Sequence, residues 1–249
     1  MSGHSKWNTI RRKKEKLDTQ RGKIFTKLIR ELTVAAREGG GDINSNVRLR
    51  SAVQIAKDSN MPQANIDKAI KKGTGELPGV DYEEAIYEGY GPGGVALLIE
   101  VLTDNRNRTT AELRHVLTKN GGRLGEAGCV AWMFEQRGLL TVDKDKVDEE
   151  TLMDTVLDLG ADDVRTEESF YEVSSAPEFF ETIRNGLKEK GIDYAEATLA
   201  KVPQNTVTPE NKEAGRLLKL IGVIEEHDDV QHVFSNFDAP LELMERLMS

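Results

Sequence analysis

The charge of this chain changes sign at a short glycine- and proline-rich segment, residues 73–79. Residues 1–75 contain 17 Lys and Arg against 7 Asp and Glu, whereas residues 76–249 contain 17 against 36. The segment itself, GTGELPG, has no hydrophobic period and has the composition of a linker. The sequence therefore predicts a domain boundary here, between a basic amino-terminal part and an acidic remainder.

The basic part has the periodicity of a small helical domain, which we place at residues 1–80. Apolar residues recur at steps of three and four between positions 24 and 36, and a glycine run at residues 39–41 ends that pattern. Two shorter patterns of the same kind follow, at residues 46–56 and 62–72. We expect the outer faces of these helices to carry the basic side chains Lys27, Arg30, Arg37, Arg48, Arg50, Lys57, Lys68, Lys71 and Lys72.

The acidic part begins with a period of two. Residues 82–90 and 94–102 have the composition of two strands, and GPG at residues 91–93 predicts the turn of a hairpin. We expect a helix at residues 109–119 and a further strand at residues 129–134.

Residues 139–201 predict the element order βαββαβ, which is the split βαβ arrangement of ferredoxin-like folds. A tail with a helix, a strand and a last short helix follows, and it is too small to bury much apolar surface alone. We expect this tail to return to the domain that begins at residue 81, which fits the two or three domains that 249 residues suggest. The predicted class is α+β with three domains: a basic arm and three-helix domain at 1–80, a discontinuous α/β domain at 81–136 plus 207–249, and an inserted ferredoxin-like α/β domain at 137–206.

The amino-terminal end concentrates basic side chains around a tryptophan. Such a segment fits a polyanion, because neutralising phosphates releases counterions and supplies most sequence-independent affinity for nucleic acid. Trp7 either stacks on an unpaired base or anchors the arm to the helical domain. A solvated helix face and a nuclear-import signal are alternative interpretations of the same run. The candidate nucleic-acid-binding residues are Lys6, Trp7, Arg11, Arg12, Lys13, Lys14, Lys16, Arg21, Lys23 and Lys27.

A second polar cluster lies where the second strand of the hairpin gives way to a helix. One carboxylate, two amides and two guanidinium groups at a strand end could bind phosphate, ribose or an RNA loop, or could dock a protein. The alternative is structural: Asn107 or Arg108 with Thr109 begins the helix, and Asp104 pairs with an arginine. The residues of this possible second RNA or partner site are Asp104, Asn105, Arg106, Asn107 and Arg108.

Signals for catalysis, cofactors or metals are poor. The four histidines are scattered, and no His/Cys cluster has metal-ligand spacing. Cys129 is interpreted as a small hydrophobic residue rather than a nucleophile. The glycine string at residues 89–94 leads into a strand, whereas a phosphate-binding loop opens a helix, so we interpret it as turn chemistry. We expect a protein without enzymatic activity and without a cofactor.

The same composition indicates the compartment. The longest apolar run, residues 95–99, is far shorter than the roughly 20 residues of a membrane span. A single cysteine cannot form an internal disulfide and suits a reducing interior. The expected location is the cytoplasm, with no membrane partner.

Six motifs are spread along the sequence: GHSKW at residues 3–7, RGKIFTKL at 21–28, GGD at 40–42, NMP at 60–62, YEGYGPGG at 87–94 and LTDNRNRT at 102–109. These motifs resemble the YebC/PmpR family, and the likeness extends over nearly the whole chain. The resemblance implies a cytoplasmic, non-catalytic protein with a helical amino-terminal domain and two α/β domains.

Two functions agree with this resemblance. Family members are described as DNA-binding transcriptional regulators, in which the arm and basic helices would hold a duplex. Relatives that include mitochondrial translational activators act on the ribosome and ease the synthesis of proline-rich stretches. In the second case the arm would bind ribosomal RNA, and residues 104–108 would lie near tRNA. Phosphate contacts do not distinguish DNA from RNA, so the sequence leaves both open.

Overall fold

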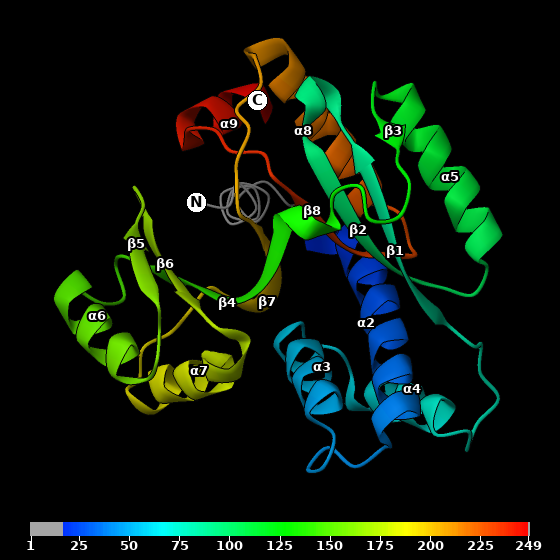
Figure 1. The fold of residues 1–249 in the computed structure, drawn as a ribbon. Helices are drawn as coiled ribbons and strands as arrows, with labels where there is room; N and C mark the ends of the chain where they lie inside the picture. The colour runs from blue at the N-terminus through cyan, green and yellow to red at the C-terminus, as the bar shows by residue number, and fades with distance from the viewer. Residues whose placement is uncertain (1–16, 249) are drawn as a thin grey trace.

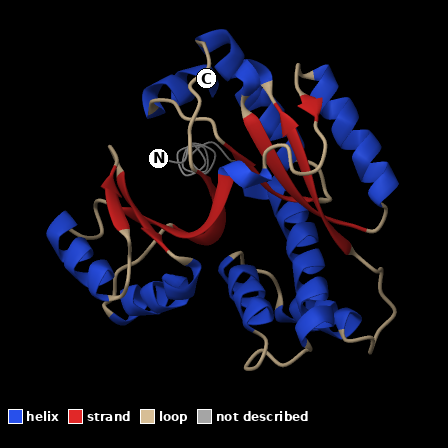
Figure 2. Ribbon diagram, in the orientation of Figure 1, coloured by secondary structure: helices blue, strands red, loops and turns tan. Residues whose placement is uncertain are grey.

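The computed structural model of the chain describes residues 17–248 (Figure 1). It combines an amino-terminal helical unit with two four-stranded antiparallel sheets, each packed against helices (Figure 2). The α+β class and the predicted three-part fold, helices first and two α/β domains after, are confirmed. No helix within the described residues is both long enough and apolar enough to cross a membrane.

The helical unit consists of α2 (Leu17–Gly39), α3 (Val47–Asp58) and α4 (Gln63–Gly73). Its core contains Leu32, Leu49 and other apolar side chains at the expected helical spacing. Asn46 caps α3: its Oδ1 accepts a hydrogen bond from the Leu49 amide at 3.0 Å. The Asn46 side-chain amide also donates to the carbonyl oxygens of Ala35 and Gly40, at 2.7 and 2.8 Å. This single side chain therefore joins the end of α2 to the start of α3.

The first sheet has the strand order β3-β1-β2-β8, and its outer strands come from distant parts of the chain. The predicted hairpin is present, with the turn η1 (Pro92–Gly94) between its strands. Helices α5, α8 and α9 contribute to the core on one face of this sheet, with Leu97, Leu113 and Leu217 among its fully buried side chains. The elements are β1 (Glu83–Tyr90), β2 (Ala96–Thr103), α5 (Arg106–Lys119), β3 (Arg123–Leu124), α8 (Asn211–Glu225), β8 (Val230–Ser235) and α9 (Leu241–Met248).

The second sheet has the strand order β5-β6-β4-β7, and its elements follow one another along the chain in the predicted order βαββαβ of ferredoxin-like folds. Both of its helices pack on one face, over a core that includes Leu140, Val173 and Ile183. The elements are β4 (Phe134–Asp143), α6 (Glu149–Asp158), β5 (Asp163–Thr166), β6 (Phe170–Ser175), η3 (Pro177–Phe179), α7 (Phe180–Glu189) and β7 (Glu196–Pro203).

The two sheets share a further apolar cluster. Leu98 and Phe234 of the first sheet pack with Phe134, Leu139 and Ala200 of the second. The second sheet thus covers the part of this face of the first sheet around Leu98 and Phe234. The two α/β parts of the molecule are joined by buried apolar surface.

The predicted strand at residues 129–134 is wrong for all but its last residue. Residues 125–130 form an irregular loop, η2 (Ala131–Met133) is a 3₁₀ turn, and β4 begins at Phe134. The backbone amides that a strand would have used for pairing bond instead to a buried carboxylate, described below.

Candidate nucleic-acid interface

The basic side of α2 contacts the first sheet and α8. The Arg30 guanidinium donates hydrogen bonds to the carboxylate of Asp229 and, at 2.9 Å, to the carbonyl oxygen of Leu102. Lys27 Nζ donates to the carbonyl oxygen of Glu225 at 2.7 Å. Near the helix start, Lys23 Nζ lies 3.7 Å from a carboxylate oxygen of Glu226. These contacts dock the helical unit on the acidic remainder of the chain.

Arg48 of α3 extends the same joint. Its guanidinium lies within 2.7 Å of carboxylate oxygens of Glu31, Glu38 and Glu84, the last of which belongs to β1. The hydrogen bond to Glu31 is the largest effect on the pKa of Arg48 and raises it, so this side chain stays charged. Arg37 adds an ion pair to Asp81 at 3.8 Å.

Five basic side chains predicted to lie on outer faces or to bind nucleic acid therefore contact the neighbouring domain or its linker. Carboxylates and carbonyl oxygens of the acidic part attract these side chains. The sequences of the helices alone do not reveal these partners. The five residues are Lys23, Lys27, Arg30, Arg37 and Arg48.

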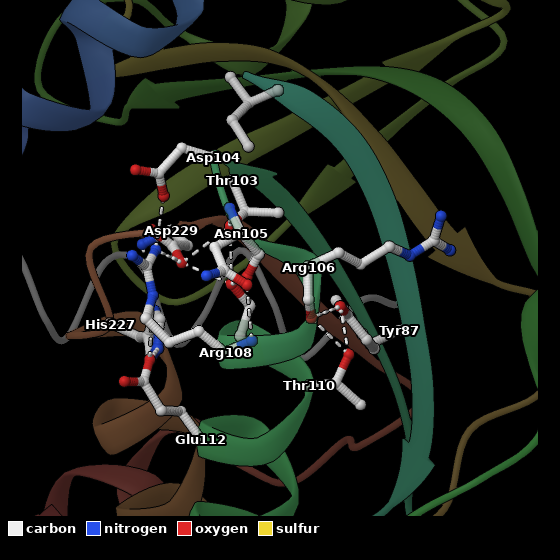
Figure 3. A network of polar contacts seen from close by, with 12 residues as sticks. Tyr87, Thr103, Asp104, Asn105, Arg106, Arg108, Thr110, Glu112, His227 and Asp229 are labelled. Atoms are coloured by element: carbon white, nitrogen blue, oxygen red, sulfur yellow. Dashed lines mark hydrogen bonds and ion pairs between the residues drawn. The ribbon is translucent and has the colours of Figure 1, made fainter. Parts of the chain in front are cut away.

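Asp229 is the centre of the joint (Figure 3). Its side chain is 2% exposed and accepts hydrogen bonds from Arg30, from Arg108 Nη2 at 2.8 Å and from the Thr109 hydroxyl at 2.6 Å. Burial alone would raise the pKa of Asp229, but the hydrogen bonds from Arg30, Thr109 and Arg108 outweigh it and hold the pKa well below its usual range. Asp229 is therefore an ionised, paired carboxylate between two guanidinium groups.

The turn between β2 and α5 supplies half of this network. Asn105 is the N-cap of α5, and its Oδ1 accepts from the Arg108 amide at 3.1 Å. Arg108 Nη2 also donates to the Asp104 carboxylate at 2.8 Å, which is the pairing that the structural alternative predicted for Asp104. The same alternative began the helix at Asn107 or at Arg108 with Thr109, whereas the cap is Asn105. Arg106 and Asn107 are exposed, and Figure 3 shows the Arg106 side chain pointing away from the network. Of the predicted second site, three residues build the joint and two face solvent.

Glu112, His227 and Asp229 bring three metal-ligating groups together. His227 uses both ring nitrogens: Nε2 lies 2.8 Å from Glu112 Oε2, and Nδ1 lies 3.1 Å from the Asp229 amide. The Asp229 oxygens are taken by two guanidinium groups and a hydroxyl. This donor set does not fit a cation, because positive charge already occupies the carboxylate.

Most of the predicted arm lies outside the described residues: Lys6, Trp7, Arg11, Arg12, Lys13, Lys14 and Lys16. Arg21 lies in α2, where only the backbone is described. Lys23 and Lys27 are at the joint. Lys23 and Arg37 are exposed but paired. Among the residues whose side chains are described, the exposed basic side chains of the helical unit that form no ion pair belong to α3 and α4: Arg50, Lys57, Lys68 and Lys71. The Arg50 guanidinium donates to the carbonyl oxygens of Ile43 and Asn44.

Glu88 of β1 is an important residue that the sequence analysis missed. It is 7% exposed, and its carboxylate accepts hydrogen bonds from the amides of Gly128, Val130 and Ala131 at 2.6, 2.6 and 2.8 Å. Burial opposes ionisation, but these three bonds prevail and lower the pKa of Glu88. These three hydrogen bonds to Glu88 hold the loop at residues 125–133 in place. In the sequence, the only indication was a glutamate within a predicted strand, whose side chains alternate between the two faces of a sheet.

Trp132 lies in the loop that Glu88 holds, and this residue is 65% exposed to solvent. Cys129, in the same loop, is half-buried, and burial raises the pKa of its thiol. The thiol is therefore less readily ionised than usual, which fits the predicted non-nucleophilic role.

Two protein-family models match this chain. Residues 5–76 match the TACO1/YebC protein N-terminal domain, and residues 82–237 match the TACO1/YebC second and third domain. The chain belongs to the TACO1/YebC family. The family likeness predicted from the motifs is thus confirmed. The gap between the two matches, residues 77–81, overlaps the segment 73–79 where the charge of the chain changes sign.

Relatives of this family are similar over their full length. Proteins named probable transcriptional regulatory protein from Syntrophus aciditrophicus and Geobacter sulfurreducens are 55% and 56% identical, with at least 99% of each chain covered. The crystal structure of a conserved hypothetical protein from Aquifex aeolicus is 46% identical, covers 90% of this chain and 93% of its own, and superimposes with a TM-score of 0.82. The whole three-part arrangement is therefore common to this chain and that structure.

Proposed function

We propose that this protein is a non-enzymatic, cytoplasmic regulator of gene expression that binds nucleic acid through its basic amino-terminal part, with DNA-binding regulation of transcription as its first role. The names of its relatives support a regulatory role. The charge distribution supports the mode of binding: residues 1–75 carry a surplus of ten positive charges, while the rest of the chain is acidic.

The observation that carries this proposal is the division of the basic residues in the helical unit. Those on α2 and at the start of α3 dock the unit, while Arg50, Lys57, Lys68 and Lys71 of α3 and α4 are exposed. These four residues, and the basic residues that precede α2 in the sequence, are proposed as the side chains that bind the phosphates of the nucleic acid. Arg106 and Asn107, exposed at the start of α5, are proposed as a further contact.

The second candidate is a ribosome-associated translation factor that binds ribosomal RNA or tRNA and relieves stalling at proline-rich stretches. The acidic body favours it, because residues 76–249 carry a surplus of 19 negative charges. A duplex lying along the whole molecule would be repelled, whereas one basic end suits a single docking site.

Both candidates are tested with a chain in which Arg11, Arg12, Lys13 and Lys14 are replaced by Ala. Extracts containing the wild type or this variant are sedimented, and nucleic acid crosslinked to each is sequenced. Salt-dependent binding to specific duplex sites, lost in the variant, supports transcriptional regulation; co-migration with ribosomes, lost in the variant, supports the second candidate. A variant that keeps full binding to all nucleic acid would contradict both.

A matched control replaces Lys144, Lys146, Lys188 and Lys190 by Ala. These residues lie in the ferredoxin-like part, so the control changes net charge equally at a different place. If the control lost binding to the same extent, the effect would report total charge and not the amino-terminal surface.

A further inference from the structure

An open hollow at the end of the first sheet is lined by residues of the β1–β2 turn, of the end of α5 and of α8. Its volume is about 690 Å³. A second hollow of about 440 Å³ adjoins it, sharing Gly91, Gly94 and Gly121 with the first and adding Tyr90 and Arg123. The two form one continuous depression around the glycine-rich turn.

The turn leaves its backbone accessible. Gly93 and Gly94 both have φ near +70°, a left-handed conformation that favours glycine. A Cβ at Gly93 would lie 2.5 Å from Pro209 Cβ, whereas nothing lies within 4 Å of the corresponding position at Gly94. A ligand can therefore approach the main chain closely at Gly94.

Positive charge gathers around this depression, in a part of the chain where acidic residues outnumber basic ones two to one. Four basic side chains and one carboxylate line it: Lys119, Arg123, Arg216, Lys219 and Glu213. Among the residues whose side chains are described, no ion pair engages any of these four basic side chains. They differ in this from the basic residues of α2.

Tyr90 lines the depression on its Arg123 side. The Arg123 guanidinium lies 5.0 Å from the centre of the Tyr90 ring. The Tyr90 hydroxyl and the Trp132 indole both donate to the carbonyl oxygen of Cys129, each at 3.2 Å. Trp132 is thus held beside Tyr90 with its ring exposed to solvent, and Glu88 fixes the loop that carries it.

From this geometry we propose that the glycine-rich turn, its four basic side chains and Trp132 form a binding site for single-stranded nucleic acid. Phosphates occupy the depression between Lys119, Arg216 and Lys219, and a neighbouring base stacks on Trp132. Basic grooves combined with exposed aromatic rings are the arrangement that binds unpaired strands. A duplex is excluded, because its bases are stacked internally and offer Trp132 no face. The site deepens the proposed function by naming an unpaired strand as the second ligand, and it is tested independently.

The first measurement uses the fluorescence of Trp132. The chain contains two tryptophans, so a Trp7→Phe chain reports Trp132 alone. The probe is an oligouridine of about 12 nucleotides, within the roughly 4–16 nucleotides that such sites cover. We expect quenching by oligouridine or oligothymidine and none by a duplex of equal length. Quenching by oligouridine alone supports RNA as the source of the strand; no quenching by either overturns the proposal.

Variants separate stacking from charge. Trp132→Ala should weaken oligouridine binding roughly 5- to 150-fold, and Trp132→Phe should restore most of it. Arg216→Ala with Lys219→Ala should reduce the slope of log affinity against log salt by about 1.4, as the loss of two phosphate contacts predicts. The control pair Lys146→Ala with Lys190→Ala makes the same charge change in the ferredoxin-like part and should leave the slope unchanged. Equal effects of the two pairs would overturn the proposal.

Crosslinking locates the strand. An oligouridine containing 4-thiouridine is irradiated with the full chain, and the modified peptides are identified. Adducts within residues 119–132 or 213–219 support the site. Adducts confined to residues 1–75 overturn it while leaving the proposed function intact. Conversely, the variant with Ala at Arg11, Arg12, Lys13 and Lys14 tests the proposed function and should retain adducts at Trp132 if the two sites are independent. A surface that binds protein instead would give no oligonucleotide adduct at either segment.

Discussion

The basic side chains of α2 and α3 and those around the β1–β2 turn carry the same charge in very different surroundings. Arg30 and Arg48 lie against Asp229, Glu31 and Glu84, and their charge is balanced within the molecule. Arg216 and Lys219 line an open hollow and form no ion pair with another described residue. This difference shows that a basic run in a sequence gives only the number of positive charges. The fold determines how many of these charges are paired within the molecule and how many can bind a ligand.

Replacing Asp229 by Ala should have the largest effect on the balanced side of this comparison. The change leaves Arg30 and Arg108 without their shared carboxylate, and removing one partner of a buried pair costs about 3–5 kcal/mol. Urea unfolding should show this loss, whereas Asp228→Ala, at the exposed neighbouring position, should lie within about 0.5 kcal/mol of the wild type. Equal stability of the two variants would mean that Asp229 does not hold the joint together.

Glu88→Gln should have the next largest effect. An amide in place of the carboxylate offers one acceptor oxygen to three backbone amides, so about 2 kcal/mol of unfolding free energy should be lost. The emission of Trp132 in a Trp7→Phe chain should change at the same time, because the loop loses its support. Glu126→Gln, an exposed change in the same loop, is the control and should alter neither.

The pH dependence of stability should be smaller than either substitution, since protonation weakens these contacts without removing the side chains. The pKa values of Asp229 and Glu88 lie below their ordinary values of 3.8 and 4.5 in the folded chain. As the pH falls, the two carboxylates therefore bind protons in the unfolded chain before they do so in the folded chain. The stabilising contribution of these carboxylates is complete above about pH 5 and declines as the pH falls through the folded pKa values. Urea unfolding between pH 6 and pH 3 should give a steeper loss for the wild type than for a chain with Asp229→Ala and Glu88→Gln; parallel curves would contradict this assignment.

The smallest effects sharpen the comparison directly. Arg48→Ala removes a partly exposed set of ion pairs to three glutamates and should cost about 1 kcal/mol at low salt, and less at high salt. Arg216→Ala with Lys219→Ala should change stability by less than about 0.5 kcal/mol, since no ion pair is lost. A large loss from the second change would show that those side chains stabilise the fold and are not reserved for a ligand.

Local patterns explain which elements could be predicted from the sequence. The β1–β2 hairpin follows from alternating residues around GPG, and the βαββαβ order follows from periods of two and 3.6 between short turns. The two-residue strand β3 was missed because Arg123 and Leu124 offer no period. The expected strand at residues 129–134 failed because Glu88, about 40 positions earlier, captures the amides of its loop.

The candidate sites were harder to predict because their partners are distant in sequence. The residues 103–109 have the composition of a cap, and Asp104 pairs with Arg108 as one alternative predicted. Nothing near them indicates Asp229, which lies 121 positions from Arg108 and 199 from Arg30. Likewise, the hollow at the glycine-rich turn needs Arg216 and Lys219, which join it only when α8 packs beside the hairpin.

The apolar cluster formed by Leu98, Phe234, Phe134, Leu139 and Ala200 has a consequence for how the molecule responds to salt. Hydrophobic contact is insensitive to moderate ionic strength, whereas the Arg48 ion pairs weaken as salt screens them. Rising salt should therefore weaken the exposed ion pairs of the helical unit first. The buried pair of Arg30 with Asp229 and the apolar contact between the two sheets should keep the three parts together under the same conditions.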